Sequence, residues 1–218
     1  MKPPVKFESI YKQNFESGVQ QPGWQTWDAQ PAPGSWDYSA TPLDGVFSAT
    51  FAENQPGVSL GAFYNFVNPL NEMAITFLFR TSAYPQELIL EVCDLYNKDG
   101  EEVLDLFLDP AGKILLTIGR GEARILTPLP IDTTVAFRIY YKNNLSIPSI
   151  ASVAWTLPGQ PLPTSGPQFA SAPDGIYHTP ITKLLWGPLG GSVVFYYDDL
   201  DISIPVQHGN GKGIITAQ

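Results

Sequence analysis

The 218-residue chain carries a formal net charge of −9, with 21 acidic residues against 12 Lys and Arg. Nucleic acid and anionic membrane surfaces are therefore disfavoured as partners, because a polyanion would be repelled overall. A single cysteine, Cys93, excludes an intrachain disulfide and is expected inside the core. No apolar run reaches the ~18 residues that a membrane-spanning helix needs. Hydrophobic residues make up 44% of the chain, which is enough for one core.

The apolar runs alternate with period two or are continuously apolar, which predicts strands and no long helix. In chain order, the predicted strands cover residues 75–80, 88–96, 103–108, 114–118, 123–126, 135–141, 151–156, 181–186 and 193–204. Asp and Gly at 97–100 and 109–113 indicate hairpin turns. Residues 75–141 are therefore expected to form an antiparallel meander.

Two segments lack this pattern and are predicted to be loops. Residues 18–45 are rich in Pro, Gly, Gln, Trp and Asp, and residues 157–180 carry six prolines. Long loops in compact domains are often functional or contact a partner. Both segments are therefore candidate binding surfaces.

The last predicted strand begins apolar and turns acidic midway. Strand parity places Asp198 in the same row as Leu200 and Ile202, which are expected to be buried. A buried carboxylate needs backbone N–H donors, a cation or a metal. This strand therefore predicts a β-sandwich that is closed by its final strand.

The chain resembles jelly-roll carbohydrate-binding modules at both ends of this sandwich. Asn14 to Gly18, followed by Trp24, resembles their first strand, and Val194 to Ile202 resembles their last. The hairpins between resemble concanavalin A-like and laminin-G-like sandwiches. The resemblance covers roughly residues 13–204. It implies an all-β fold, a two-sheet antiparallel jelly-roll sandwich of the concanavalin A-like type, whose first and last strands are adjacent. The expected organisation is an N-terminal arm over residues 1–12, the sandwich over 13–204 and a C-terminal tail over 205–218.

Three aromatic residues of the first loop are candidates for sugar binding: Trp27, Trp36 and Tyr38. The apolar C–H faces of sugar rings pack well on aromatic side chains, and exposed aromatic patches mark interaction sites. The alternative is that these residues cover an edge of the sandwich. Trp24 matches an aromatic residue that the resemblance places in the core.

The resemblance also implies a structural Ca²⁺ near the joined first and last strands. The candidate ligands are Asp198, Asp199 and Asp201, together with Glu16 and Asp44. Calcium takes six to eight oxygen ligands, many of them from carboxylates. In the alternative, Asp198 accepts backbone N–H bonds, and Asp199 and Asp201 are solvated.

The sequence predicts no catalytic pair of carboxylates. Retaining glycosidases need two carboxyl groups about 5–5.5 Å apart. Glu87 and Glu91 share a strand face but would lie ~13 Å apart along it, and Glu91 and Asp94 are expected on opposite faces. Only two histidines are present, His178 and His208, too few for a zinc site. The chain is therefore predicted not to be an enzyme.

These observations predict a non-catalytic, lectin-like module that binds a glycan or cell-surface polysaccharide. Because the start of the sequence shows no export signal, the expected location is the surface of a bacteriophage virion, as a decoration, head-fibre or tail protein made in the host cytoplasm. An extracellular location is the alternative if a signal peptide has been removed. A second hypothesis is a purely structural protein that assembles with other virion proteins or as a homo-oligomer. A third is a glycan-cleaving enzyme with an atypical site.

Overall fold

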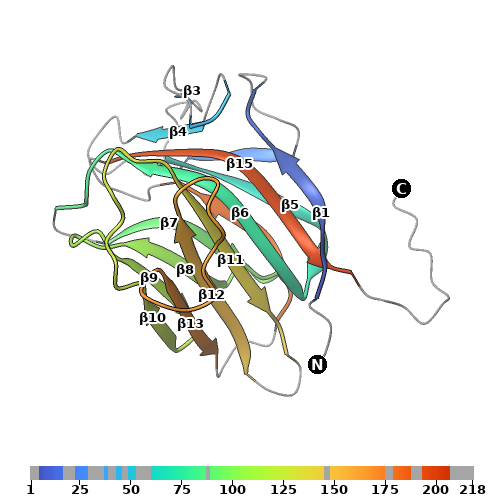
Figure 1. The fold of residues 1–218 in the computed structure, drawn as a ribbon. Coiled ribbons are helices and arrows are strands. Elements are labelled where there is room, and N and C mark those ends of the chain that lie inside the picture. The colour runs from blue at the N-terminus through green and yellow to red at the C-terminus, as the bar shows by residue number, and fades with distance from the viewer. Residues whose placement is uncertain are drawn as a thin grey trace.

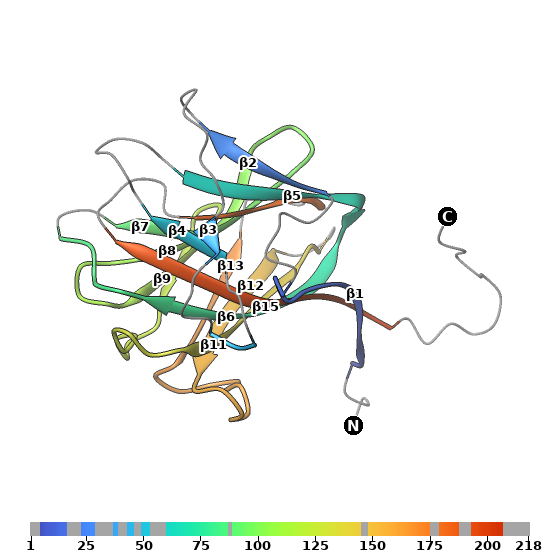
Figure 2. The same ribbon diagram turned by 90° about the horizontal axis from the view of Figure 1, so that it is seen from above.

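A computed structural model describes residues 5–16, 23–28, 37–38, 43–45, 49–52, 60–86, 89–144, 148–174, 179–187 and 193–206. Within these ranges the chain forms fifteen strands and no helix. The strands make two antiparallel sheets that pack as two layers around one core (Figure 1, Figure 2). The prediction of an all-β jelly-roll sandwich is confirmed.

The eight-stranded sheet has the order β13-β12-β11-β6-β15-β4-β3, and β1 also pairs with β15. Its strands are β1 (Phe7–Gln13), β3 (Asp37–Tyr38), β4 (Ala49–Ala52), β6 (Glu72–Thr81), β11 (Val135–Lys142), β12 (Ser149–Thr156), β13 (Phe169–Asp174) and β15 (Val194–Pro205).

The seven-stranded sheet has the order β10-β9-β8-β7-β14-β5-β2. Its strands are β2 (Trp24–Asp28), β5 (Leu60–Leu70), β7 (Leu90–Tyr96), β8 (Glu102–Leu108), β9 (Ile114–Ile118), β10 (Gly121–Arg124) and β14 (Ile181–Trp186). The face of this sheet that points away from the core is called the outer face below.

Aromatic side chains from both sheets fill the core between them. Trp186 stacks on Tyr197 with ring centroids 4.8 Å apart, and it also contacts Trp24. The Tyr197 hydroxyl donates a 2.7 Å hydrogen bond to the Val92 carbonyl, which joins the two sheets and satisfies a buried polar group. Trp24 and Cys93 are both buried, as expected from the sequence.

The first and last strands lie side by side, which confirms the central expectation of the jelly roll. β1 pairs with β15 from Gln13 opposite Leu200 to Phe7 opposite Pro205. Beyond the strands, the Val206 N–H donates to the Lys6 carbonyl. β1 therefore begins within residues 1–12, which were expected to form an N-terminal arm.

The predicted meander is only partly correct. β7 to β10 pair in succession, but β6 and β11 pair with each other in the opposite sheet. β1 to β5 and β13 were not predicted, and β2 and β3 lie within residues 18–45, which were expected to be a loop. β13 lies in the proline-rich segment and includes Pro173, which is tolerated because β13 is the edge of its sheet.

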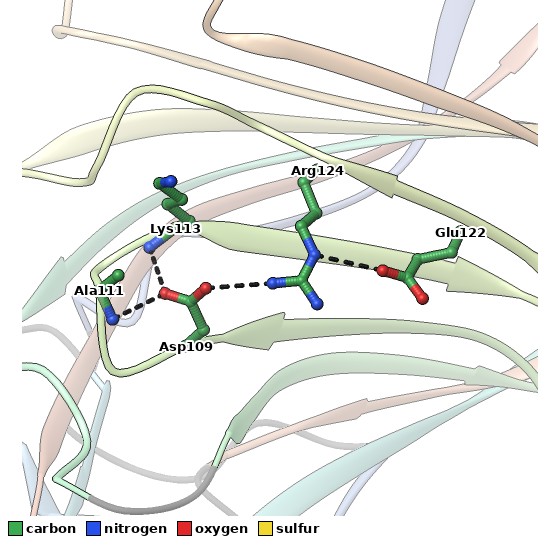
Figure 3. A network of polar contacts seen from close by, with 5 residues as sticks. All are labelled: Asp109, Ala111, Lys113, Glu122 and Arg124. Atoms are coloured by element: carbon green, nitrogen blue, oxygen red, sulfur yellow. Dashed lines mark hydrogen bonds and ion pairs between the residues drawn. The ribbon is translucent and has the colours of Figure 1, made fainter.

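The turn between β8 and β9 forms as its Asp and Gly predict. Asp109 Oδ1 accepts the N–H groups of Ala111 (2.9 Å) and Lys113 (2.8 Å). Asp109 Oδ2 lies 3.3 Å from Nη1 of Arg124, whose Nε pairs with Glu122 (Figure 3). One carboxylate therefore closes the turn and ties the edge strand β10 to it.

Candidate functional site

A row of paired residues crosses the outer face of the seven-stranded sheet from edge to edge. Its members, from β2 to β10, are Gln25, Phe63, Leu185, Asp94, Asp105, Thr117 and Glu122. Their strand neighbours, such as Leu104 and Leu106, point into the core. Two carboxyl groups therefore face each other on adjacent strands at the middle of this face.

A β-bulge brings a third carboxyl group to the same place. In the pairing of β7 with β8, Glu91 lies opposite Phe107 while Cys93 lies opposite Leu106, so that one residue of β7 is extra. An extra residue reverses strand parity beyond it. Glu91 and Asp94 therefore share the outer face, and the expectation that they lie on opposite faces is wrong. Glu91, Asp94 and Asp105 are called the carboxyl cluster below.

The carboxyl cluster holds protons at pH values where ordinary carboxyl groups are ionised. Burial, followed by the negative charges of Glu102 and Asp105, raises the pKa of Glu91 to about 7. Burial and then the charge of Glu91 raise the pKa of Asp94 well above its ordinary value. A side-chain hydrogen bond between the two opposes the rise in the pKa of Glu91 and adds to the rise in that of Asp94. Burial and mutual repulsion therefore favour the protonated forms of both groups.

Asp105 is held differently from the other two. Its Oδ2 accepts a 2.8 Å hydrogen bond from the Thr117 hydroxyl. Burial raises the pKa of Asp105, and this hydrogen bond opposes the rise. Asp105 thus has a fixed partner that favours its ionised form.

Three carboxyl oxygens of the cluster are buried and lack a hydrogen-bond partner among the described residues. They are Glu91 Oε2, Asp94 Oδ1 and Asp105 Oδ1. Buried polar atoms normally have partners, and exceptions often mark a functional role or an unseen ligand. The cluster therefore has free capacity to bind hydrogen-bond donors.

The neighbouring row on the outer face carries a tyrosine and a lysine. Tyr96 lies opposite Glu102 on one side and Lys183 on the other, and its hydroxyl donates to Glu102 (3.2 Å). The Lys183 ammonium lies 5.2 Å from the centre of the Phe63 ring and 5.4 Å from that of Tyr96. Aromatic, cationic and acidic groups therefore surround the cluster, a mixture that is typical of a binding site.

The structure describes little of the three aromatic residues that were predicted to bind sugar. Trp27 lies in β2 opposite Gly61, and Tyr38 lies in β3 opposite Ala49. Their side chains, and all of Trp36, lie outside the described residues. Stacking on a sugar therefore stays a prediction for all three.

The predicted calcium ligands do not form one site. Asp198 is buried, and its two oxygens accept the N–H groups of Asp44 (3.2 Å) and Asp199 (2.8 Å). Asp44 and Glu16 lie near Asp199 and raise its pKa after the effect of burial. Asp201 instead pairs with a lysine of β1 at 3.2 Å. The described ranges contain no group of three His, Cys, Asp or Glu side chains arranged to hold a metal. Calcium stays a prediction.

Described residues of the eight-stranded sheet line two of the cavities of the molecule. One, of about 570 Å³, is lined by residues of β1, β6 and β15, including Lys12 and Asp201. The other, of about 300 Å³, lies beneath the proline-rich loop at Pro163 and is lined by Phe7 and Tyr140. No described segment forms a helix of the length and apolarity that crossing a bilayer takes.

Together, these features define a jelly-roll β-sandwich with a cluster of three carboxyl groups on the outer face of one sheet. No protein-family model and no curated protein matches the chain. Among solved structures, the marine PL-14 alginate lyase from Aplysia kurodai matches with a TM-score of 0.66 and 9% identity, over 91% of this chain and 100% of its own.

 The endo-β-1,4-glucuronan lyase of the fungus Trichoderma reesei matches with a TM-score of 0.64 and 9% identity, over 89% of this chain and 95% of its own.

A toxin domain shares the same architecture. The binding domain of botulinum neurotoxin DC, solved in complex with SialylT, has a TM-score of 0.57 and 7% identity, over 89% of this chain and 47% of its own. At such low identity, these likenesses establish the fold. The chain has the fold of a two-sheet antiparallel jelly-roll sandwich, as its resemblance implied.

The prediction of a non-catalytic, lectin-like module is contradicted. Two lyases of polysaccharides match the chain over nearly all of its length and theirs, with higher TM-scores than the toxin domain. The sequence argument against an enzyme rested on the lack of a carboxylate pair. The bulge in β7 removes that argument, because it gathers Glu91, Asp94 and Asp105 on one face.

Proposed function

We propose that the protein is a glycan-cleaving enzyme and that the carboxyl cluster on the outer face is its catalytic centre. The observation that carries this proposal is the bulge in β7, which gathers Glu91 and Asp94 opposite Asp105. The lyases that share the fold support the substrate class, since alginate and glucuronan are both glycans. The virion location remains a prediction and is independent of this proposal.

Glu91 is the proton donor in this proposal. Cleavage of a glycosidic bond requires a proton on the departing oxygen, and the best acid has a pKa near the working pH. A pKa of about 7 places Glu91 in that range. Asp94, which is buried and hydrogen-bonded to Glu91, acts as a positioning residue.

Asp105 is the second functional carboxyl group. It lies directly opposite Asp94, and residues paired in this way have Cβ atoms about 4.5–5.5 Å apart. The Thr117 hydroxyl favours its ionised form. Two carboxyl groups whose environments push their pKa values apart are the usual basis of acid–base assignments.

The test compares the wild type with Glu91→Gln on a panel of polysaccharides, with new reducing ends as the readout. We expect at least a 100-fold loss of kcat in the variant, because general acid catalysis contributes about 10²–10⁴-fold. The matched control is Glu8→Gln, an exposed residue of β1 in the other sheet. The wild-type rate should fall above about pH 7, where Glu91 loses its proton. Unimpaired cleavage by Glu91→Gln, or no cleavage of any polysaccharide by the wild type, would refute the proposal.

A further inference from the structure

We infer that the substrate of the carboxyl cluster is a glycan without carboxylates, either neutral or carrying amino groups, and that it is cleaved by hydrolysis. This inference rests on the proposed function and narrows it. It separates the chain from the alginate and glucuronan lyases of the same fold, since the substrates in their names are polyuronates. Two properties of the outer face, its charge and its hydrogen-bonding capacity, support it, and the chemistry of the substrate gives the reaction.

The first property is charge. Glu102 and Asp105 both lie close enough to Glu91 to raise its pKa by repulsion. The row beside the cluster contributes one cation within the described ranges, Lys183, which lies over the Phe63 and Tyr96 rings. The row of Glu91 ends at Arg124, which is already paired with Asp109 and Glu122. A uronate would bring a further negative charge into a site where acidic groups already repel one another. A neutral or amino sugar avoids this cost.

The second property is hydrogen bonding. The three buried oxygens without described partners belong to Glu91, Asp94 and Asp105. In its ionised form, which the Thr117 hydroxyl favours, Asp105 only accepts hydrogen bonds, so that its unpartnered oxygen needs a donor from the ligand. Sugar hydroxyls and ammonium groups donate, whereas the carboxylate of a uronate only accepts. Asp105 is therefore complementary to a ligand that is rich in donors.

The reaction depends on the chemistry of the substrate. β-Elimination removes a proton from the carbon beside a sugar carboxylate, which stabilises the resulting carbanion. A substrate without that carboxylate lacks this stabilisation, so that its glycosidic bond is cleaved by water instead. The C–O bond breaks, and the proton of Glu91 passes to the departing oxygen. The oxygen of water bonds to the anomeric carbon, and the proton of water passes to the Asp105 carboxylate. One water molecule is consumed for each bond that is cleaved.

Binding is tested separately from cleavage. The protein is run through native gels that contain a soluble neutral β-glucan, glycol chitosan or alginate at pH 7. We expect at least tenfold stronger retardation by the glucan or by glycol chitosan than by alginate. Glu102→Lys, which leaves the carboxyl cluster intact, should strengthen retardation by alginate and weaken that by glycol chitosan. Glu8→Lys is the matched control and should change neither. Equal or stronger binding of alginate by the wild type would overturn the inference.

The chemistry is followed on the same polymers by new reducing ends and by the ultraviolet absorbance of unsaturated products. Reducing ends without this absorbance are expected from the glucan or from glycol chitosan. Unsaturated products from alginate would overturn the inference while leaving the proposed function standing. If no polymer is cleaved but Glu91→Ala abolishes retardation by the neutral or amino polymer, the proposed function fails and the ligand class stands. If neither of these polymers retards the protein, the inference is wrong.

Discussion

The carboxyl cluster should make the protein less stable at alkaline pH, and Glu91→Gln should remove this effect. The pKa of Glu91 rises from an ordinary 4.5 to about 7 on folding. The folded protein therefore holds this proton more tightly than the unfolded chain does. The free energy of unfolding should fall as the pH rises from 4.5 through 7, and the full loss is present above pH 7.

The loss of unfolding free energy follows from the rise in the pKa of Glu91. Each pKa unit corresponds to about 1.4 kcal/mol, which gives about 3 kcal/mol for Glu91. Water at its partly exposed carboxyl group reduces this to about 2 kcal/mol. A domain of this size changes its Tm by about 2–4 °C per kcal/mol. Glu91→Gln should therefore raise the Tm at pH 8 by about 4–8 °C and leave it nearly unchanged at pH 4.5.

Thermal unfolding at a series of pH values measures this difference directly. Glu8→Gln should follow the wild type at every pH, because Glu8 is exposed. A Tm difference for Glu91→Gln that does not depend on pH would refute the reasoning. So would a variant that is less stable than the wild type at pH 8. The same variant is expected to be inactive, so that a gain in stability would accompany the loss of catalysis.

Three further predictions concern the sandwich itself. Gly112→Ala should lower the free energy of unfolding by about 1–3 kcal/mol, because Gly112 has a φ of 77° and an added Cβ would meet the Tyr84 ring. Gly100→Ala has a similar φ but open space around it, so that it should lower the free energy of unfolding by less in urea. Equal losses for the two variants would contradict this account. Trp186→Ala should lower the free energy of unfolding by about 3–5 kcal/mol in the same assay, because it leaves a cavity at the centre of the core. A loss below about 1 kcal/mol would contradict this packing. Because both Asp198 oxygens already accept backbone N–H groups, a chelator should leave the Tm unchanged, and a fall of several degrees would instead support the predicted calcium.

The sequence predicted the fold well because its signals are local. Strict alternation identified β11, and the Asp and Gly of two turns identified the hairpins on either side of β8. Strands β6 and β11 were assigned to the wrong neighbours, because pairing across sheets depends on the whole topology and leaves no local mark. β13 was missed because prolines usually indicate a loop, although an edge strand accepts them.

The candidate site was missed for a different reason. Glu91 and Asp94 are three residues apart, so that a regular strand places them on opposite faces. A bulge changes this, and no residue around Val92 indicates one in the sequence. A signal was nevertheless present. The predicted turn at residues 97–100 brings Asp94 and Asp105 close together on paired strands, and two acidic residues within such apolar strands are unusual. The predicted sugar-binding residues lie in the expected loop 18–45, whereas the carboxyl groups lie on a sheet face.

The pairing of β1 with β15 has a consequence for protein engineering. Lys6 and Val206 are hydrogen-bonded neighbours, so that any polypeptide joined before one or after the other leaves from the same edge of the sandwich. Domains with adjacent ends tolerate circular permutation and insertion into host loops. A short glycine linker between these two positions should permit new termini at the open Gly100 turn, far in sequence from the strands that close the jelly roll.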